Sequence, residues 1–312
     1  MRLMSIRRRL RVGGRASHLA VAQSRLVMAA IAAAHPELEL ELVTFRTTGD
    51  VNMKPFAEAS DPAGIKGLFT LELERALLGG AIDLAVHSLK DLPMVQDPRL
   101  PIVAYSRRDD PRDALVLPVD ADGRALEDEG GPIGCSSLRR RLQLARLFPG
   151  RATEPVRGSV STRLRKLDEG QFSMLVLAAA GLKRLRLEAR ASRILGVEEM
   201  VPAAGQGILA CQGRAGEAYD FLDAVRDRDA EDCARAERSF AAALGGGCTQ
   251  PVGAFASVNG DELTLTGFCL LDALAGERRG RIVGPRARAE ALGRHLAARL
   301  APNAVLREGA GA

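Results

Sequence analysis

The amino-acid sequence predicts an α/β protein of two or three domains that ends in a small α+β domain. With 312 residues, the chain is longer than one compact core usually accommodates. Apolar strand and helix patterns alternate through most of the chain, which favours mostly parallel sheets. After Gly205-Gln206-Gly207 the pattern changes to one helix followed by closely spaced strands.

The first α/β unit begins with a β-loop-α pattern around Gly13-Gly14, and its helix ends before Pro36. A second unit follows Asp109-Asp110-Pro111. The elements expected in the two units are strands from Leu10 and at 39–45, 82–86, 132–135 and 174–178, and helices at about 17–34, 68–78, 138–147 and 159–167. Residues 122–131 are expected to form a surface loop.

The C-terminal segment predicts the small α+β domain. Its expected elements are a helix at about 230–244, strands at 252–258, 263–270 and about 280–283, and a helix at about 286–300. Asn259-Gly260 between the first two strands is a strong signal for a hairpin turn.

Composition narrows the possible functions. The net charge of +5 favours anionic ligands, while 4% aromatic residues and no Trp leave few platforms for stacking nucleic-acid bases. We find no apolar region of a signal peptide after the N-terminal arginines and no membrane span. Five cysteines without a CxxC pair indicate reduced thiols in the cytoplasm, and the four histidines lack metal-ligand spacing, so we expect no metal site.

Three strand-to-helix junctions place arginine beside hydroxyl residues. They are Arg15 with Ser17; Ser136 and Ser137 with Arg139 and Arg140; and Arg157 with Ser159, Ser161, Thr162 and Arg163. A helix start offers free N–H groups and a positive dipole end, and arginine adds a planar fork that matches a carboxylate. The hydroxyls could instead be ordinary helix caps and the arginines solvated residues. Because all three junctions fall at carboxyl ends of strands, we favour a site for a polyanion.

Lys90 and Asp91 also follow an apolar strand. The Asp91 carboxylate could stabilise a cationic intermediate or transfer protons, or it could simply shape the loop before Pro93. His87, on the strand itself, could be an acid or base, but a buried histidine is more often a core residue.

Cys248 follows Gly245-Gly246-Gly247, so its thiol should lie on an open loop that favours reactivity. The alternative is a free cysteine without a function, which suits Cys135, Cys211, Cys233 and Cys269 better because each lies in an apolar pattern.

Read together, these segments resemble the porphobilinogen deaminase family from about Leu10 to the last helix. The motifs that carry the resemblance are Arg15-x-Ser17-x-Leu19-Ala20 with Gln23, Thr48-Gly49-Asp50, Lys66-Gly67-Leu68-Phe69, His87-Ser88-x-Lys90-Asp91-x-Pro93, Asp110-Pro111-Arg112-Asp113-Ala114, Ser136-Ser137-Leu138-Arg139-Arg140, Arg157-Gly158 with Thr162-Arg163, Gly181-Leu182-Lys183-Arg184, and Gly246-Gly247-Cys248. Their order and spacing make a coincidence very improbable.

The resemblance implies a role for each site residue. Cys248 would carry a dipyrromethane cofactor through a thioether, and Asp91 would be the main catalytic carboxylate. The residues that would bind the acetate and propionate groups of the cofactor and growing chain are Arg15, Ser17, Lys90, Ser136, Ser137, Arg139, Arg140, Arg157, Arg163 and Arg184.

The resemblance also implies the reaction. Four porphobilinogen molecules would be condensed head to tail with loss of ammonia, through an electrophilic azafulvene, and hydrolysis would release hydroxymethylbilane for tetrapyrrole synthesis. The enzyme would be a cytoplasmic monomer and a transferase that binds neither nucleic acid nor membrane. A non-catalytic solute-binding protein and a basic nucleic-acid-binding module are the competing hypotheses.

The fold implied by the family has two α/β domains with mixed sheets, like those of periplasmic binding proteins, and a C-terminal domain with a three-stranded antiparallel sheet. The domains would span residues 1–106 with 207–225, 107–206, and 226–312. The chain departs from the family's usual residues at His18, Cys135, Ser159, Ser161 and Gly245. None of these departures removes a charge from the expected site, although Cys135 replaces a hydroxyl near the cofactor.

Overall fold

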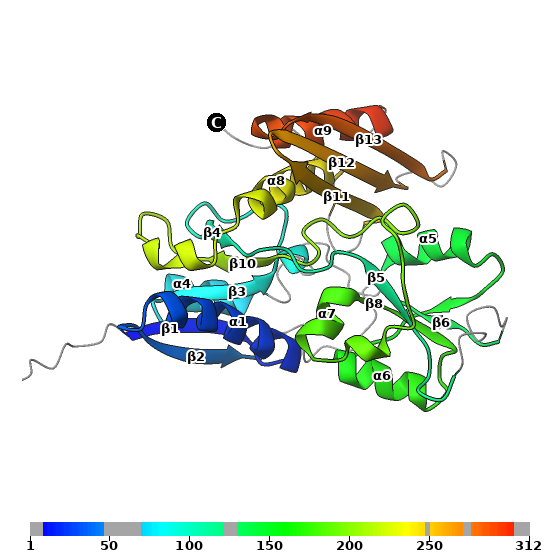
Figure 1. Cartoon of the computed structure of the whole chain (residues 1–312), viewed down its shortest axis with the longest axis horizontal. Coiled ribbons are helices and arrows are strands. Elements are labelled where there is room, and N and C mark those ends of the chain that lie inside the picture. Colours follow the sequence, from blue (N-terminus) through cyan, green and yellow to red (C-terminus); the bar gives the residue numbers. More distant parts are fainter. Residues whose placement is uncertain (1–8, 47–69, 122–129, 247–249, 271–275, 303–312) are drawn as a thin grey trace, which may run out of the picture. The chain divides into compact units, whose positions relative to one another are not determined.

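The computed structural model describes residues 9–46, 70–121, 130–246, 250–270 and 276–302 (Figure 1). The chain forms two compact units, Met1–Arg107 with Leu209–Arg228, and Arg108–Ile208 with Asp229–Ala312. The finer division into three domains stays a prediction. No helix in the described ranges is long and apolar enough to cross a membrane.

The first unit is built on a five-stranded mixed sheet. Its strands are β1 (Arg9–Arg15), β2 (Glu39–Phe45), β3 (Leu84–Ser88), β4 (Ile102–Tyr105) and β10 (Leu209–Gln212), in the order β2-β1-β3-β10-β4. β1 pairs in parallel with β2 and β3, while β10 is antiparallel to β3 and β4.

Successive side chains of β3 point to opposite faces of this sheet, and a different helix packs against each face. Leu84 and Val86 belong to the cluster that includes Val27 of α1 (His18–Ala34), whereas Ala85 packs with Leu73 of α4 (Leu71–Leu78). The strand is therefore buried on both faces, as its continuous apolar sequence predicts. Two short 3-10 turns, η2 (Leu89–Asp91) and η5 (Asp220–Ala224), complete the unit.

The second unit contains another five-stranded mixed sheet, in the order β7-β6-β8-β5-β9. Its strands are β5 (Asp113–Val116), β6 (Ile133–Gly134), β7 (Thr153–Glu154), β8 (Met174–Ala178) and β9 (Arg193–Ile194). Its helices are α5 (Leu138–Leu147), α6 (Val160–Asp168), α7 (Ala179–Arg184) and the 3-10 turn η4 (Glu188–Arg190). Leu175 of β8 packs with Leu164 of α6, and Val176 with Leu144 of α5, so this sheet too is covered on both faces.

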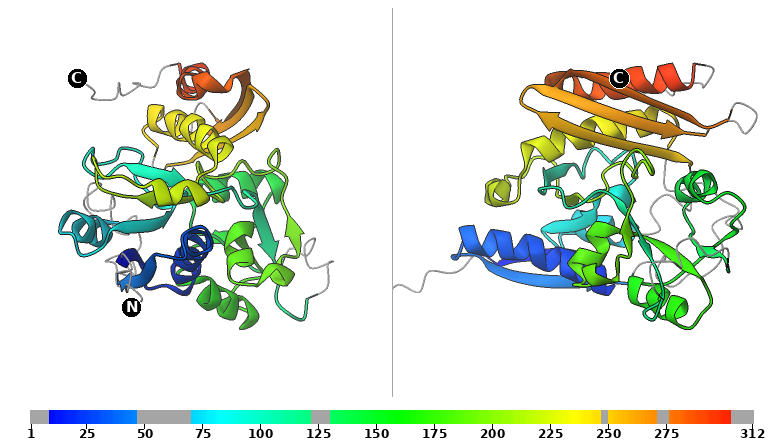
Figure 2. Two further views of the ribbon diagram at one scale, coloured as in Figure 1. Left: turned by 60° about the vertical axis from the view of Figure 1, so that its left-hand side comes forward. Right: turned by 45° about the vertical axis from the view of Figure 1, so that its right-hand side comes forward.

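The same unit ends in α8 (Arg228–Ala243) and a three-stranded antiparallel sheet. The sheet consists of β11 (Val252–Asn259), β12 (Glu262–Cys269) and β13 (Arg278–Pro285), and η6 (Arg286–Arg288) leads into α9 (Ala289–Leu300). Gly260 has φ +59° in the β11–β12 turn, which explains the Asn-Gly signal there. Figure 2 shows α9 lying along one face of this sheet.

The fold class predicted from the family, two mixed α/β sheets and an antiparallel C-terminal sheet, is confirmed. The mostly parallel sheets expected from the sequence pattern alone are wrong, because β4, β5, β9 and β10 were not predicted and bring in the antiparallel pairings. The predicted strand 82–86 is displaced by two residues to 84–88. Asp83 lies just before the strand; its N–H donates to the Arg11 carbonyl and its carboxylate accepts from the Arg11 N–H, both at 2.8 Å.

Candidate active site

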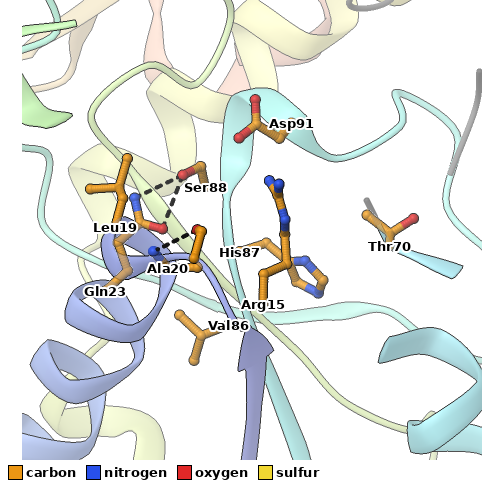
Figure 3. A pocket seen from close by; sticks show the side chains of 10 residues that line it. Arg15, Leu19, Ala20, Gln23, Thr70, Val86, His87, Ser88 and Asp91 are labelled. Carbon is orange, nitrogen blue, oxygen red and sulfur yellow. Dashed lines mark hydrogen bonds between the residues drawn. The ribbon is translucent and has the colours of Figure 1, made fainter. Parts of the chain in front are cut away.

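A pocket lies in the first unit at the carboxyl ends of β1 and β3 (Figure 3). Parallel neighbouring strands end at one edge of a sheet, so residues far apart in sequence meet there. The residues lining the pocket are Arg15, Ser17, Leu19, Ala20, Gln23, Thr70, Val86, His87, Ser88 and Asp91.

Polar side chains fix the helix that forms one wall of this pocket. Ser17 caps α1, because its hydroxyl accepts a hydrogen bond from the Ala20 N–H at 3.3 Å. Gln23 donates to the Ser88 hydroxyl at 2.8 Å and accepts from it at 3.2 Å. These contacts tie α1 to the end of β3. Gly14 permits this close approach, since a Cβ there would lie 2.3 Å from the Ser24 hydroxyl.

Arg15 and Asp91 bring opposite charges into the pocket. Figure 3 shows the Arg15 guanidinium extending toward the side of the pocket where Asp91 lies. Asp91 ends the η2 turn, which is anchored by the buried side chains of Leu89 and Leu92. Lys90 occupies the same turn and is half-buried, but it does not line the pocket as far as the chain is described.

His87 is buried against the same pocket, with 6% of its surface exposed. Burial lowers the pKa of its imidazole to about 4, opposed by the nearby Gln212 side chain and helped by the positive charge of Arg15. The ring is therefore neutral near pH 7, so it can hydrogen-bond but is a poor source of a cationic acid.

The junctions of the second unit are ordered by hydrogen bonds to backbone. The Ser136 hydroxyl donates to the Val156 carbonyl at 2.6 Å and accepts from the Val156 N–H at 3.0 Å. The Ser159 hydroxyl caps α6 by accepting from the Thr162 N–H at 3.2 Å. Ser159, like Ser17, is therefore a helix cap, whereas Ser136 ties the segment before α5 to Val156. Ser137 occupies the cap position of α5 without a side-chain cap bond.

Two of the expected arginines lie at the start of the second unit's helix α6, Arg157 in the loop before it and Arg163 in its first turns. Arg163 donates from Nε to the Gly158 carbonyl at 2.9 Å, and Arg157 is half-buried next to that glycine. Gly158 has φ +106°, and a Cβ there would lie 2.8 Å from Thr162, so the turn requires glycine.

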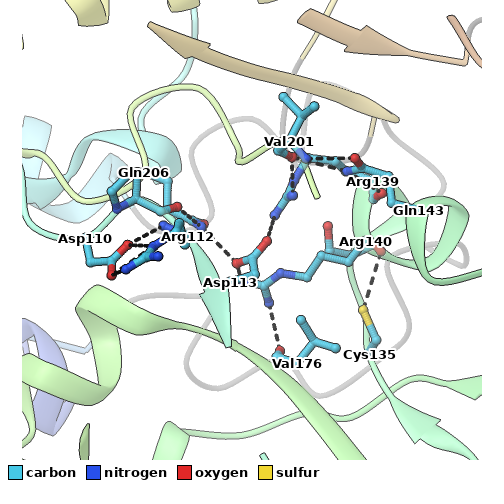
Figure 4. Close-up of polar contacts among 12 residues, drawn as sticks. Asp110, Arg112, Asp113, Cys135, Arg139, Arg140, Gln143, Val176, Val201 and Gln206 are labelled. Carbon is cyan, nitrogen blue, oxygen red and sulfur yellow. Dashed lines mark hydrogen bonds and ion pairs between the residues drawn. The ribbon is translucent and has the colours of Figure 1, made fainter. Parts of the chain in front are cut away.

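Arg139 and Arg140 lie in a buried ionic cluster rather than on an open surface (Figure 4). The fully buried Asp113 carboxylate accepts from Arg139 Nη2 at 2.9 Å, Arg140 Nη2 at 2.7 Å and Gln206 Nε2 at 2.8 Å. The Nη1 atoms of the two arginines donate to the carbonyls of Val201 and Val176. Burial lowers the pKa of Arg139 below its usual value, opposed by Asp113.

Among the described residues of this cluster, two guanidinium groups face one carboxylate. Both arginines belong to the first turn of α5, whose dipole end is also positive. A ligand carboxylate near the start of α5 would therefore be attracted even though the guanidinium groups are already bonded.

Arg184 also makes an internal pair. Its side chain is 5% exposed, and it donates to Asp109 Oδ2 at 3.1 Å and to the Gly207 carbonyl at 2.6 Å. Lys183 reaches the other oxygen of Asp109 at 2.8 Å. Arg184 thus fixes the Gly205–Gly207 turn, and burial lowers its pKa.

The structure therefore divides the predicted site residues into groups. Arg15, Ser17 and Asp91 line the pocket of the first unit, whereas the arginines of α5 and α7 form internal ion pairs. Cys248 lies outside the described residues. Cys135, Cys211, Cys233 and Cys269 are buried, and burial raises the pKa of each thiol, which disfavours the reactive thiolate form.

The sequence analysis missed three contributors. Thr70 was not singled out, and Gln23 and Asp113 were quoted within motifs without a role. Asp113 carried a readable signal, since it directly precedes the apolar run 114–117 and a buried carboxylate needs cationic or hydrogen-bonding partners.

Comparison with protein families gives two matches. Residues 10–219 match the dipyrromethane cofactor-binding domain of porphobilinogen deaminase, and residues 232–302 match the C-terminal domain of porphobilinogen deaminase. A porphobilinogen deaminase of Ruminiclostridium cellulolyticum is 47% identical over 289 residues, covering 93% of this chain and 96% of its own. One of Acetivibrio thermocellus is 48% identical over 294 residues, covering 93% and 97%.

Solved structures give a more distant likeness. The effector-binding domain of BenM with benzoate is 14% identical, with a TM-score of 0.42, over 70% of this chain and 89% of that one. The periplasmic aliphatic sulphonate-binding protein SsuA of Escherichia coli is 12% identical, with a TM-score of 0.37, over 66% and 61%.

Proposed function

The chain belongs to the porphobilinogen deaminase family, and from this premise we propose that it is a transferase that builds hydroxymethylbilane from porphobilinogen. As a member of this family the protein is an enzyme of tetrapyrrole synthesis. The observation that best supports the proposed reaction is the pocket that Arg15 and Asp91 both line.

The residues present suit a dipyrromethane cofactor and its carboxylate groups. Arg15 places a guanidinium group in the pocket of the first unit, and the α5 cluster of the second unit holds two guanidinium groups at a helix start. We propose that Cys248 carries the cofactor by a thioether and that Arg15, Ser17, Lys90, Ser136, Ser137, Arg157 and Arg163 hold its carboxylates and those of the growing chain. The cofactor supplies the nucleophilic pyrrole carbon.

Arg139, Arg140 and Arg184 enter this proposal in a modified role. Each is nearly buried and already donates hydrogen bonds to an internal carboxylate, so fewer of its N–H groups are available to contact a ligand. We propose that they act mainly by holding the start of α5 and the Gly205–Gly207 turn in place while their charge attracts the ligand.

Asp91 is the proposed catalytic carboxylate. When porphobilinogen loses ammonia from its aminomethyl carbon, positive charge spreads onto its pyrrole nitrogen. A carboxylate fixed by the anchored η2 turn stabilises that charge more than it stabilises the neutral ground state, which lowers the barrier. Arg15 binds a substrate carboxylate and keeps the ring beside Asp91.

Incubation of the purified protein with porphobilinogen tests this function. We expect one ammonia released for each porphobilinogen consumed and one linear tetrapyrrole for every four. Binding of porphobilinogen without release of ammonia would instead support a solute-binding protein. Binding to a polynucleotide that weakens steeply as salt rises would support a nucleic-acid-binding module.

A further inference from the structure

Thr70 stands at the N-cap of α4 but its hydroxyl does not cap the helix. A threonine at this position ordinarily accepts a hydrogen bond from a backbone N–H of the first turn. Here the side chain is 2% exposed, lines the pocket beside Arg15, and its Oγ1 has no hydrogen-bond partner among the described residues. The sequence therefore keeps a buried polar atom in a place where valine would fit equally well.

A second buried polar group, His87, lines the same pocket. It is 6% exposed, and its Nε2 makes no well-formed hydrogen bond among the described residues; the Gln212 side chain of the neighbouring strand β10 lies close enough to act on its pKa, but Gln212 Oε1 is unpaired as well. Buried polar groups are nearly always paired, because an unpaired one loses its bonds to water without compensation. The unpaired Thr70 hydroxyl, with an imidazole beside it that Gln212 does not satisfy by a well-formed bond, points to an external partner in this pocket.

The charge beside them indicates the partner's chemistry. Arg15 lies in the same pocket, in the strand that pairs with β3, and its positive charge acts on His87 (Figure 3). A carboxylate has about four acceptor sites, and an arginine fork occupies only two of them. A neutral imidazole N–H and a hydroxyl can fill the others without adding charge.

We propose that Thr70 and His87 form a neutral hydrogen-bonding subsite that, together with Arg15, binds one carboxylate side chain of the pyrrole ligand. This inference rests on the proposed function and adds two binding residues to it. Neither residue is required to move a proton, and Asp91 keeps its role on the pyrrole nitrogen. The subsite should act on ligand binding more than on the chemical step.

Thr70→Val tests the subsite, because it removes the hydroxyl while keeping the branched shape. Since no hydrogen bond within the described protein is lost, the Tm of the substrate-free protein should stay the same or rise. The KM for porphobilinogen should increase roughly tenfold with kcat within about twofold, as expected for one lost bond to a charged group. Thr70→Ser, which keeps the hydroxyl, should restore the parent KM.

Intact mass spectrometry gives a readout that does not depend on turnover. After one equivalent of porphobilinogen is added, a smaller fraction of Thr70→Val than of the parent should carry an added pyrrole. His87→Met should behave like Thr70→Val, while His87→Gln, which retains an N–H donor, should lie nearer the parent. If Thr70→Val fails to fold, the two His87 variants test the subsite by the same measurements of KM and added pyrrole.

A parent-like KM and pyrrole occupancy in both Thr70→Val and His87→Met would overturn the subsite. A lowered Tm of substrate-free Thr70→Val would also overturn it, because the hydroxyl would then be bonded within the protein. Absence of porphobilinogen turnover in the parent itself would count against the proposed function instead.

Discussion

Replacement of Asp113 by Asn should lower the free energy of unfolding by about 3–5 kcal/mol. The carboxylate is fully buried and receives hydrogen bonds from Arg139, Arg140 and Gln206 at 2.7–2.9 Å. Asn keeps the shape of Asp but carries no charge, so two buried guanidinium groups lose their counter-ion. Uncompensated buried charge is among the most costly defects that a single substitution creates.

Urea unfolding followed by circular dichroism measures this loss. Asp110→Asn is the matched control, because Asp110 pairs with Arg112 at 2.6 Å but both side chains are 30% or more exposed. Such surface pairs contribute about 1 kcal/mol or less. A loss for Asp113→Asn no larger than that of the control would refute the view that the arginines of α5 depend on Asp113.

Three further predictions concern single side chains. Burial lowers the pKa of His87 from 6.5 to about 4, so between these pH values the folded protein binds fewer protons than the unfolded chain. Stability should therefore fall by up to about 3 kcal/mol between pH 6.5 and 4. His87→Gln should flatten this part of the profile of stability against pH, and equal slopes for parent and variant would contradict the prediction. Asp91→Asn should reduce single-turnover rates by roughly 10²–10³ with an unchanged circular dichroism spectrum, and a parent-like rate would place the catalytic carboxylate elsewhere. Arg157→Leu should accumulate partly elongated chains in mass spectra, and normal product without such chains would contradict a role in binding. Arg139→Leu should in addition lower the free energy of unfolding because Asp113 loses a partner, and parent-like stability of Arg139→Leu would contradict this.

Local patterns account for the elements that the sequence predicted well. Strand 39–45, helix 138–147 and strand 174–178 have the predicted bounds, since each has a clear apolar period and a recognisable end. The missed strands are short and depend on distant partners. β10, for example, pairs with β3 and β4 more than a hundred residues earlier in the chain, and a strand of four residues alone does not reveal that pairing.

The same distinction separates the site residues. Arg15, Ser17 and Asp91 were predictable because each follows a strand at its carboxyl end, where α/β sheets place their ligands. The burial of Arg139 and Arg140 was not predictable from their helix start, since their partner Asp113 comes from β5 in another segment. The roles of Thr70 and His87 depend on missing hydrogen bonds, which only the folded chain displays.

The intact mass of the purified protein tests the central claim most directly. The protein should weigh more than its sequence by one dipyrromethane, and Cys248→Ser should remove both this excess mass and the turnover of porphobilinogen. Replacement of the buried Cys211 or Cys269 by Ala should preserve both. A parent protein that turns over porphobilinogen while having the mass of its bare sequence would contradict the account.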